Sequence, residues 1–595
     1  MFYTKLRDAY HMVSAVKFVR LSLNNVMKKH NYVSVFILSA IGCGMSSGWC
    51  QTLPDAGSIL KEQQRTEPPS KPVGKPPTIG TPVERTDTPD SGQKILVRGF
   101  RVTGATLIPS EELQRELESG GARELTLNEI RKLAQRLPDM YRKRGLFARV
   151  LLPQQSVLEG IVEVAVLEGK LAAVEAETLP GTRFSADSAK RYITSQHRVG
   201  EPLRPDDVQW GLRNLNEVPG VIASGVLQPG ESAGDVRMGM RVESPPLLTG
   251  GVYADSFGLK ATGQVRAVGN LQLNSPFSFG DQATLLGVGT ERSGYIRAGY
   301  SLPLGYGGLR LAANAAQLEY RLANTFAGFS GMARTYGLAL SMPLLRTNNA
   351  NVYGALTADY KTSVNDGAGS LNISNKVLKT ITFEIRGDFV DSFLSPARNA
   401  FSVGIVDGHL NLGRNQGSLA ADLAGPQTNG RFNRANWSYQ RVQMFATGWE
   451  LGLTANGQFA GNNLDGYEKM SLGGPAAVRA YPSGEALGDD GFLASMELRR
   501  SFGGQWQVSA FADTGRISQL HSTFPGYNAA NPTRPNTYSL YGVGMGLQYG
   551  RPGDWFIKGM VATKLGTNPG RDINGKDADG SSSRVRAWVQ LAKFF

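Results

Sequence analysis

The feature that most constrains the fold is an alternation of apolar residues with polar or small residues that runs from Leu247 to the C-terminal Phe595. It is clear at 264–273, 449–459 and 541–549, and Gly, Asn and Asp residues separate such segments. A period of two is typical of β-strands that have one apolar face. The segments are long for the strands of a soluble sandwich, so the pattern favours a transmembrane β-barrel.

Composition supports a barrel and argues against a bundle of membrane helices. The chain has 72 Gly among 595 residues, 9% aromatic residues and only 19% charged residues. After residue 50 it contains no run of apolar residues long enough to span a bilayer as a helix. If one strand and its turn take about 22 residues, the alternating region holds about sixteen antiparallel strands, an even number as in bacterial barrels.

The last strand carries an apolar face that ends at the aromatic Phe595. This face holds Val585, Ala587, Val589 and Leu591, and Lys593 is its one interruption. A terminal aromatic residue in this setting resembles the insertion signal of bacterial outer-membrane barrels. The resemblance implies that the barrel-assembly machinery inserts the chain, and that outer-membrane lipid surrounds it.

Residues 1–50 are predicted to be a signal peptide. Lys28 and Lys29 precede a short apolar stretch at 33–41, and small residues follow it. Met27 is an alternative start. Cys43 and Cys50, the two cysteines of the chain, both lie in this segment. We therefore expect a mature protein without thiols, located outside the cytoplasm.

Two small modules precede the barrel. Residues 51–66 predict a short isolated helix, and the Pro-rich stretch 67–94 predicts a semi-extended linker. Spans 95–168 and 169–244 then show the same order of strand, helix, helix, strand and strand. Their nearly equal lengths predict tandem copies of one α+β module. Each copy should hold a three-stranded sheet with an exposed edge, where an extended segment could add as a further strand.

The first module gives two local expectations. A single strand is expected at 95–102. Thr126 and Glu129 form the capping-box pattern at the start of a helix that should end at Gly145, and Pro138 should kink that helix in its middle.

A long segment around Met470–Gly491 has no strand pattern of its own and contains Arg479. In the strand 505–513, which comes soon after it, Phe511 and Asp513 fall on the polar face that points into the lumen. A carboxylate inside a barrel requires a compensating cation. Arg479 is therefore predicted to fold into the barrel and pair with Asp513.

These features together resemble the two-partner secretion transporters of the haemolysin secretion/activation family, within the outer-membrane-protein assembly superfamily. The loop motif of that family matches Val478, Arg479 and Tyr481, and its strand motif matches Phe511, Asp513 and Gly515. Ala480 stands where the family motif has glycine, which adds a methyl group and restricts the backbone.

The resemblance implies a role for each part of the chain. Residues 51–66 would be a plug helix, 95–168 and 169–244 two POTRA modules, and 245–595 a sixteen-stranded barrel. Arg479 and Asp513 would form a loop–barrel lock. The protein would sit in the outer membrane of a Gram-negative bacterium and export one large secreted partner, such as a haemolysin, adhesin or contact-dependent toxin, by type V secretion. The POTRA modules would recognise this cargo in the periplasm.

Other functions fit the sequence less well. A barrel-assembly insertase of the same superfamily is the main alternative, but two modules behind a helix and a Pro-rich linker argue against it. A passive porin would have no use for 95–242. The five histidines are scattered, and neither HExxH nor GxSxG occurs. The segment 570–577 nearly matches a phosphate loop, but Asp577 replaces the required Ser or Thr. We expect no catalytic residue, cofactor or metal site, and the diffuse net charge of +13 indicates no nucleic-acid partner.

Overall fold

The computed structural model describes residues 54–65, 94–118, 122–155, 157, 159–551 and 553–595. The predicted signal peptide at 1–50 and nearly all of the predicted linker at 67–94 lie outside the described residues. Within the described ranges, no helix has the length and apolar character needed to cross a bilayer.

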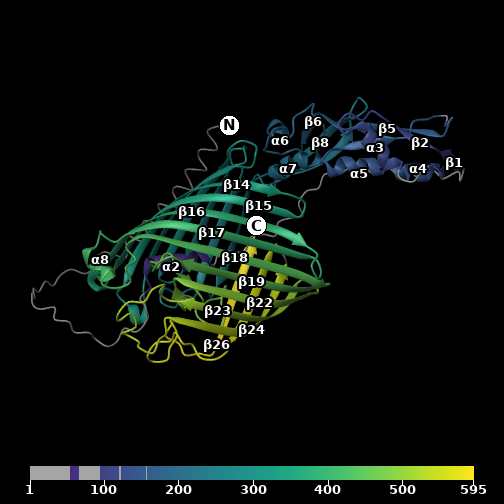
Figure 1. The fold of residues 1–595 in the computed structure, drawn as a ribbon. Helices are drawn as coiled ribbons and strands as arrows, with labels where there is room; N and C mark the ends of the chain where they lie inside the picture. The colour runs from purple at the N-terminus through teal and green to yellow at the C-terminus, as the bar shows by residue number, and fades with distance from the viewer. Residues whose placement is uncertain (1–53, 66–93, 119–121, 156, 158, 552) are drawn as a thin grey trace, which may run out of the picture. The chain divides into compact units, whose positions relative to one another are not determined.

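The C-terminal region forms a closed barrel of sixteen strands, as the alternation predicted (Figure 1). All neighbouring strands are antiparallel, and β26 pairs with β9 from Gln590↔Asp255 to Phe594↔Gly251, which closes the barrel. The strands, in the order in which they pair, are β9 (Leu248–Asp255), β10 (Arg266–Asn274), β11 (Gln282–Gly289), β12 (Ser293–Pro303), β13 (Arg310–Arg321), β14 (Ser330–Arg346), β15 (Ala350–Asp366), β16 (Asn372–Asp391), β17 (Ala397–Asn411), β18 (Gly430–Ala446), β19 (Trp449–Ala460), β22 (Asp490–Phe502), β23 (Trp506–Ser518), β24 (Thr537–Arg551), β25 (Trp555–Lys564) and β26 (Val585–Phe594).

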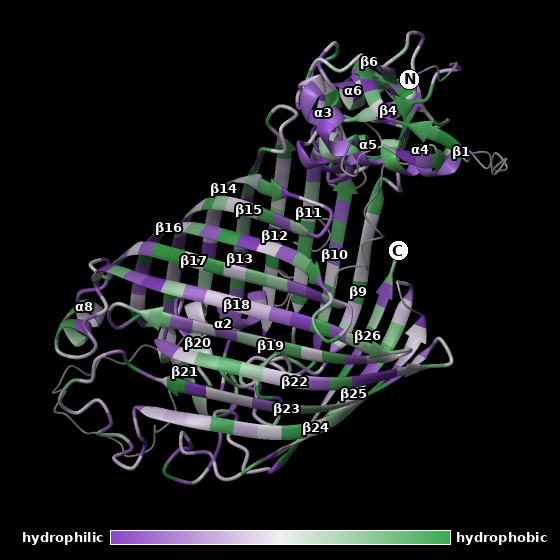
Figure 2. Ribbon diagram, turned by 45° about the vertical axis from the view of Figure 1, so that its right-hand side comes forward, coloured by the Kyte–Doolittle hydropathy of each residue, from purple (hydrophilic) through white to green (hydrophobic). Residues whose placement is uncertain are grey.

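The alternation places apolar side chains on the outer wall. Phe459 is 62% exposed and Met545 is 70% exposed, whereas Gln458, next to Phe459, is buried. Figure 2 shows hydrophobic and hydrophilic residues interleaved along the strands. Apolar side chains that point away from a closed barrel are the signature of a wall that faces lipid.

The two ends of the barrel differ. Short turns join the strands at the end where Phe595 lies, and longer connections join them at the other end, including one with helix α8 (Gln416–Leu423) (Figure 1). Short periplasmic turns and long extracellular loops are typical of bacterial barrels. We therefore take the end with Phe595 as periplasmic.

Two α+β modules precede the barrel, each with a three-stranded sheet and its own apolar core. The first holds β1 (Lys94–Val97), β2 (Gly99–Thr103), α3 (Ser110–Leu117), β3 (Arg123–Thr126), α4 (Leu127–Ala134), α5 (Arg136–Lys143), β4 (Ala148–Leu151) and β5 (Ile161–Glu168). The second holds β6 (Lys170–Thr178), α6 (Ala186–Thr194), α7 (Pro205–Asn216), β7 (Ile222–Pro229) and β8 (Asp235–Glu243). The sheet orders are β2-β5-β4 and β6-β8-β7.

Two local predictions in the first module were wrong. The single strand expected at 95–102 is divided at Arg98 into β1 and β2, because the backbone N–H groups of Arg98 and Gly99 both donate to the carbonyl of Gly160. β1 then pairs with β3 in a separate two-stranded ribbon.

The helix that was expected to kink at Pro138 is instead two helices, α4 and α5, which meet at Gln135. Pro138 lies in the first turn of α5, where a missing N–H removes no intrahelical hydrogen bond. The capping box of Thr126 and Glu129 is present at the start of α4.

The barrel lumen is filled by two segments. Helix α2 (Ala56–Arg65) lies inside the barrel, where its residues Ala56, Ile59 and Leu60 pack in a core with apolar side chains of the inner wall (Figure 1). The connection 461–489 between β19 and β22 also packs in the lumen, and it contains a small ribbon of β20 (Met470–Ser471) and β21 (Leu487–Gly488). The lumen is therefore occupied by α2 and by this connection.

Candidate functional site

Arg479 lies in the long connection between β19 and β22, here called the lumen loop (461–489). The apolar residues that pack around it come from the loop itself, from β22 to β26 of the wall and from Phe257, which follows β9. Arg479 is 5% exposed and Asp513, on β23, is 3% exposed. The loop thus brings a guanidinium to a carboxylate that the strand alternation turns inward.

Arg479 and Asp513 are joined by three hydrogen bonds. The backbone N–H and Nε of Arg479 both donate to Oδ2 of Asp513 at 3.0 Å, and Nη2 donates to Oδ1 at 2.7 Å. The guanidinium carbon also lies 3.4 Å from the centre of the Phe511 ring. A bidentate ion pair fixes both distance and orientation, so the contact holds the loop in one position against β23.

A second carboxylate, Glu497 on β22, completes the site, and the sequence analysis did not identify it. Nη1 of Arg479 donates to Glu497 at 2.8 Å, and Nη2 donates to Ser495 Oγ at 2.9 Å. The alternation of β22 held the signal, since Leu493, Ser495 and Glu497 share the face opposite the exposed Met496. The sequence analysis applied this alternation to β23, which placed Asp513 in the lumen, and did not apply it to β22.

The other motif residues pack around this ion pair. Val478, Ala480 and Tyr481 are fully buried. Gly515 on β23 leaves room for Leu472, whose Cδ2 would lie 2.8 Å from a Cβ atom at that position. The carbonyl of Arg479 accepts a hydrogen bond from Trp588 Nε1 on β26 at 2.8 Å. The loop tip is therefore held by strands from β22 to β26.

Phe595 lies away from this cluster, at the seam of the barrel. Its backbone N–H and carbonyl exchange hydrogen bonds of 3.1 Å with Gly250 at the start of β9, and the residue is 47% exposed. The terminal residue thus extends the pairing that closes the barrel.

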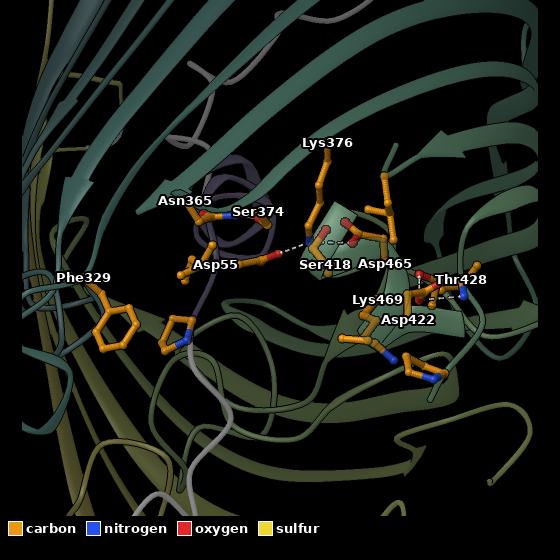
Figure 3. Close-up of a pocket in the computed structure, with 18 of the residues that line it drawn as sticks. Asp55, Phe329, Asn365, Ser374, Lys376, Ser418, Asp422, Thr428, Asp465 and Lys469 are labelled. Atoms are coloured by element: carbon orange, nitrogen blue, oxygen red, sulfur yellow. Dashed lines mark hydrogen bonds and ion pairs between the residues drawn. The ribbon is translucent and has the colours of Figure 1, made fainter. Parts of the chain in front are cut away.

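A second polar cluster anchors the extracellular end of helix α2 (Figure 3). Lys376 Nζ on β16 donates to Asp55 at 2.8 Å and to Asp465 of the lumen loop at 2.7 Å. The backbone N–H of Ala56 donates to Asn365 on β15 at 2.9 Å. These groups line a cavity of about 540 Å³ at the extracellular side. One lysine therefore ties the helix, the loop and the wall together.

Farther along the helix, further contacts reach the loop and the wall. Lys61 Nζ donates to the carbonyl of Glu468 at 2.8 Å, and the carboxylate of Glu468 pairs with Lys361 at 2.8 Å and Arg434 at 2.6 Å. Arg266 on β10, which is paired with Asp255, also donates to Gln63 at 3.4 Å. We call the Asp55–Lys376–Asp465 cluster and the Lys61–Glu468 contact the plug anchor.

Both clusters hold a lumen segment against the barrel wall through buried ion pairs. Among the described residues, no group of three His, Cys, Asp or Glu side chains could hold a metal ion. The buried carboxylates around α2 and Arg479 face cations.

Two family models match the chain. The model described as haemolysin secretion/activation protein ShlB/FhaC/HecB matches residues 235–549. The model described as POTRA domain, ShlB-type, matches residues 95–169, which is the first of the two modules.

Individual proteins are similar over most of the length. The heme/hemopexin transporter protein HuxB of Haemophilus influenzae strain 86-028NP is 23% identical over 91% of this chain and 95% of its own. The hemolysin transporter protein ShlB of Serratia marcescens is 25% identical over 70% of this chain and 73% of its own. The solved structure of CdiB from Escherichia coli superimposes with a TM-score of 0.66 at 19% identity, covering 91% of this chain and 99% of that one.

Proposed function

The chain belongs to the haemolysin secretion/activation family of ShlB, FhaC and HecB, and from this premise we propose how its barrel carries cargo. The protein is an outer-membrane transporter of the two-partner secretion type, with its POTRA modules in the periplasm. It exports a secreted partner protein, and the names of its relatives support this role over barrel insertion.

The cargo is proposed from the relatives' names. These relatives are named for transport of heme/hemopexin and of hemolysin, and others are outer-membrane transporters CdiB. We infer that this chain exports one large exoprotein of a similar kind, namely a haemolysin, an adhesin or a contact-dependent toxin. Such a cargo would still be unfolded when it emerges from the inner-membrane export machinery.

The POTRA modules would receive the extended cargo. Each three-stranded sheet has two edge strands, β2 and β4 in the first module and β6 and β7 in the second. An edge strand offers unpaired backbone groups to which an extended segment can add. Main-chain pairing would hold successive segments of a long polypeptide, and side chains beside the edge strands would recognise this one cargo.

Helix α2 would be the plug that cargo displaces. The observation that carries this proposal is that Ala56, Ile59 and Leu60 are buried inside the closed barrel while Asp55 is bound to Lys376. The helix has only about three turns, so it has little stability away from the wall. The loop–barrel lock of Arg479 and Asp513 would keep the lumen loop in place while α2 leaves.

Planar-bilayer recording tests the plug. Deleting residues 54–65 should raise the mean ion conductance of the purified protein, because it empties the lumen beside the loop. Unchanged conductance would contradict the plug role. In cells, loss of the gene should remove one secreted protein and leave other outer-membrane barrels at normal levels. A general loss of barrels would instead indicate an insertase.

A further inference from the structure

A row of polar and aromatic side chains crosses the outer face of the barrel near its extracellular end. Strand pairing connects its members directly: Tyr336↔Tyr360, Tyr360↔Lys379, Lys379↔His409 and His409↔Arg431. All five side chains are exposed. The row therefore crosses β14 to β18 without a break, and we call it the outer-face row.

On β14, β15 and β16 the outward side chains on the periplasmic side of this row are apolar. Two residues from the row toward the periplasm lie Leu338 on β14, Ala358 on β15 and Ile381 on β16, whereas β17 and β18 carry the polar Asp407 and Asn433 there. The outward positions after these are Leu340, Leu356, Phe383 and Ile405. Ile381 is 57% exposed and Ile405 is 58% exposed, as expected for residues in contact with acyl chains. Since two strand residues span about 7 Å, the outer-face row lies just beyond the apolar belt.

This height corresponds to the lipid headgroups of the outer leaflet. His409 lies near the end of β17 and Arg431 near the start of β18, beside the connection that carries α8, and Tyr336, Tyr360 and Lys379 lie farther inside β14, β15 and β16. Tyr336 and Tyr360 fit the aromatic girdle that marks the boundary between hydrocarbon and water. A surface cavity of about 620 Å³ lies here, and its lining includes both tyrosines, Lys379, His409 and Arg431, the carboxylate Asp407, and the apolar Leu338 and Ile381.

The charges of the row are only partly compensated within the protein. Arg431 donates to Asp407 at 2.9 and 3.3 Å, yet its side chain remains 79% exposed. Within the part of the chain that the structure describes, Lys379 and His409 make no hydrogen bond or ion pair with another side chain. The cavity thus presents cationic and hydrogen-bonding groups above an apolar floor.

We propose that this cavity binds a phosphorylated lipid of the outer leaflet, with a headgroup phosphate on Lys379, His409 and Arg431 and an acyl chain along Leu338 and Ile381. A phosphate accepts hydrogen bonds from ammonium and guanidinium groups. The tyrosine rings cover the sugar or glycerol part of the headgroup. The site rests on the membrane location of the barrel and is independent of how cargo is exported.

Lipid titration with native mass spectrometry tests the site. The purified full chain in detergent is titrated with bis-phosphorylated lipid A and, separately, with the same lipid after enzymatic dephosphorylation. We expect one molecule of the phosphorylated lipid to bind at least fivefold more tightly than the dephosphorylated form. The double variant K379Q/H409Q should lose that preference, and it leaves the Arg431–Asp407 pair intact.

Three outcomes would overturn the proposal. One is equal binding of the two lipids by the unchanged protein, and another is an unchanged preference in K379Q/H409Q. The third is displacement of the lipid by 10 mM inorganic phosphate alone, since the apolar floor would then contribute nothing. The control variant K576Q removes a lysine from the extracellular loop 565–584 and should bind like the unchanged protein. Because K379Q/H409Q alters only outward side chains, it should still export cargo.

Discussion

The Cβ atom of Ala480 lies 2.7 Å from the position that a Cβ atom on Gly542 would occupy. Gly542 faces Asp513 across the pairing of β23 and β24. The methyl group that distinguishes this loop from the family motif therefore fits because the wall has no side chain at the facing position. Ala480 has no positive φ angle, so the backbone of the loop tip does not require glycine.

This contact predicts a compensating pair of substitutions. Gly542→Ala should push the loop tip off the wall and cost about 1–3 kcal/mol, because overpacking a filled core forces shifts. Ala480→Gly alone should be nearly neutral, and the double variant A480G/G542A should recover cargo export. Secretion assays and protease sensitivity of the lumen loop report the result. If the double variant is as impaired as G542A, the absence of a side chain at Gly542 is not the reason that the loop tip accommodates Ala480.

The two acidic partners of Arg479 predict unequal effects of removing the members of the loop–barrel lock. Arg479→Ala leaves Asp513 and Glu497 buried without the guanidinium, whereas Asp513→Ala leaves Arg479 bound to Glu497 at 2.8 Å. Breaking a buried ion pair typically costs about 3–5 kcal/mol. We expect R479A to reduce export more than D513A, and R479A/D513A to be less damaging than the sum of both.

Arg479→Lys should not restore function, because a lysine cannot make the forked contact to Oδ1 and Oδ2 of Asp513. Cargo secretion is measured beside the heat-dependent shift of barrel migration on gels, which shows that each variant is folded. Normal secretion by R479A with a folded barrel would show that export does not need the loop–barrel lock.

The fold could be predicted from the sequence because a closed barrel repeats one local rule. Outward apolar and inward polar positions alternate, so Phe511 and Asp513 could be placed on the lumen side from parity alone. The number of strands followed from length. The division of β1 from β2 could not be predicted in this way, since it depends on the distant carbonyl of Gly160.

The plug anchor shows where prediction from sequence stops. Lys376 binds Asp55 and Asp465, which lie 321 and 89 residues away along the chain. No spacing rule connects these positions, because the loop joins β19 to β22 whereas the helix lies near the N-terminus, before the two modules. Glu497 is different: the parity of β22 would have placed it in the lumen.

The plug anchor predicts a conductance phenotype. Lys376→Met leaves Asp55 and Asp465 without their shared cation, so α2 should leave the lumen more often and mean conductance should rise in planar bilayers. Lys379→Met, three residues along the same strand, removes an outward-facing lysine and is the matched control. Equal conductance in both variants would show that the Lys376 cluster does not retain the helix.

The first POTRA module predicts a pH-dependent stability. Glu168 accepts hydrogen bonds from Tyr141 Oη at 2.6 Å and from the backbone N–H groups of Thr106 at 2.8 Å and Leu107 at 2.7 Å. Burial, the largest effect, would raise the pKa of Glu168, but the hydrogen bonds from Thr106, Tyr141 and Leu107 together outweigh it and lower that pKa below its ordinary value.

A carboxyl whose pKa is lower in the folded state stabilises the fold above its unfolded pKa of about 4.3, and this stabilisation is lost as the pH falls through the folded value. Glu168→Gln should therefore reduce hydrogen-exchange protection of residues 95–168 at pH 7 and make no difference at a pH below the folded value, where Glu168 itself is protonated. Glu124→Gln, at an exposed carboxyl on β3, is the control. A loss of protection in E168Q that is the same at both pH values would mean that shape, and not charge, matters at this position.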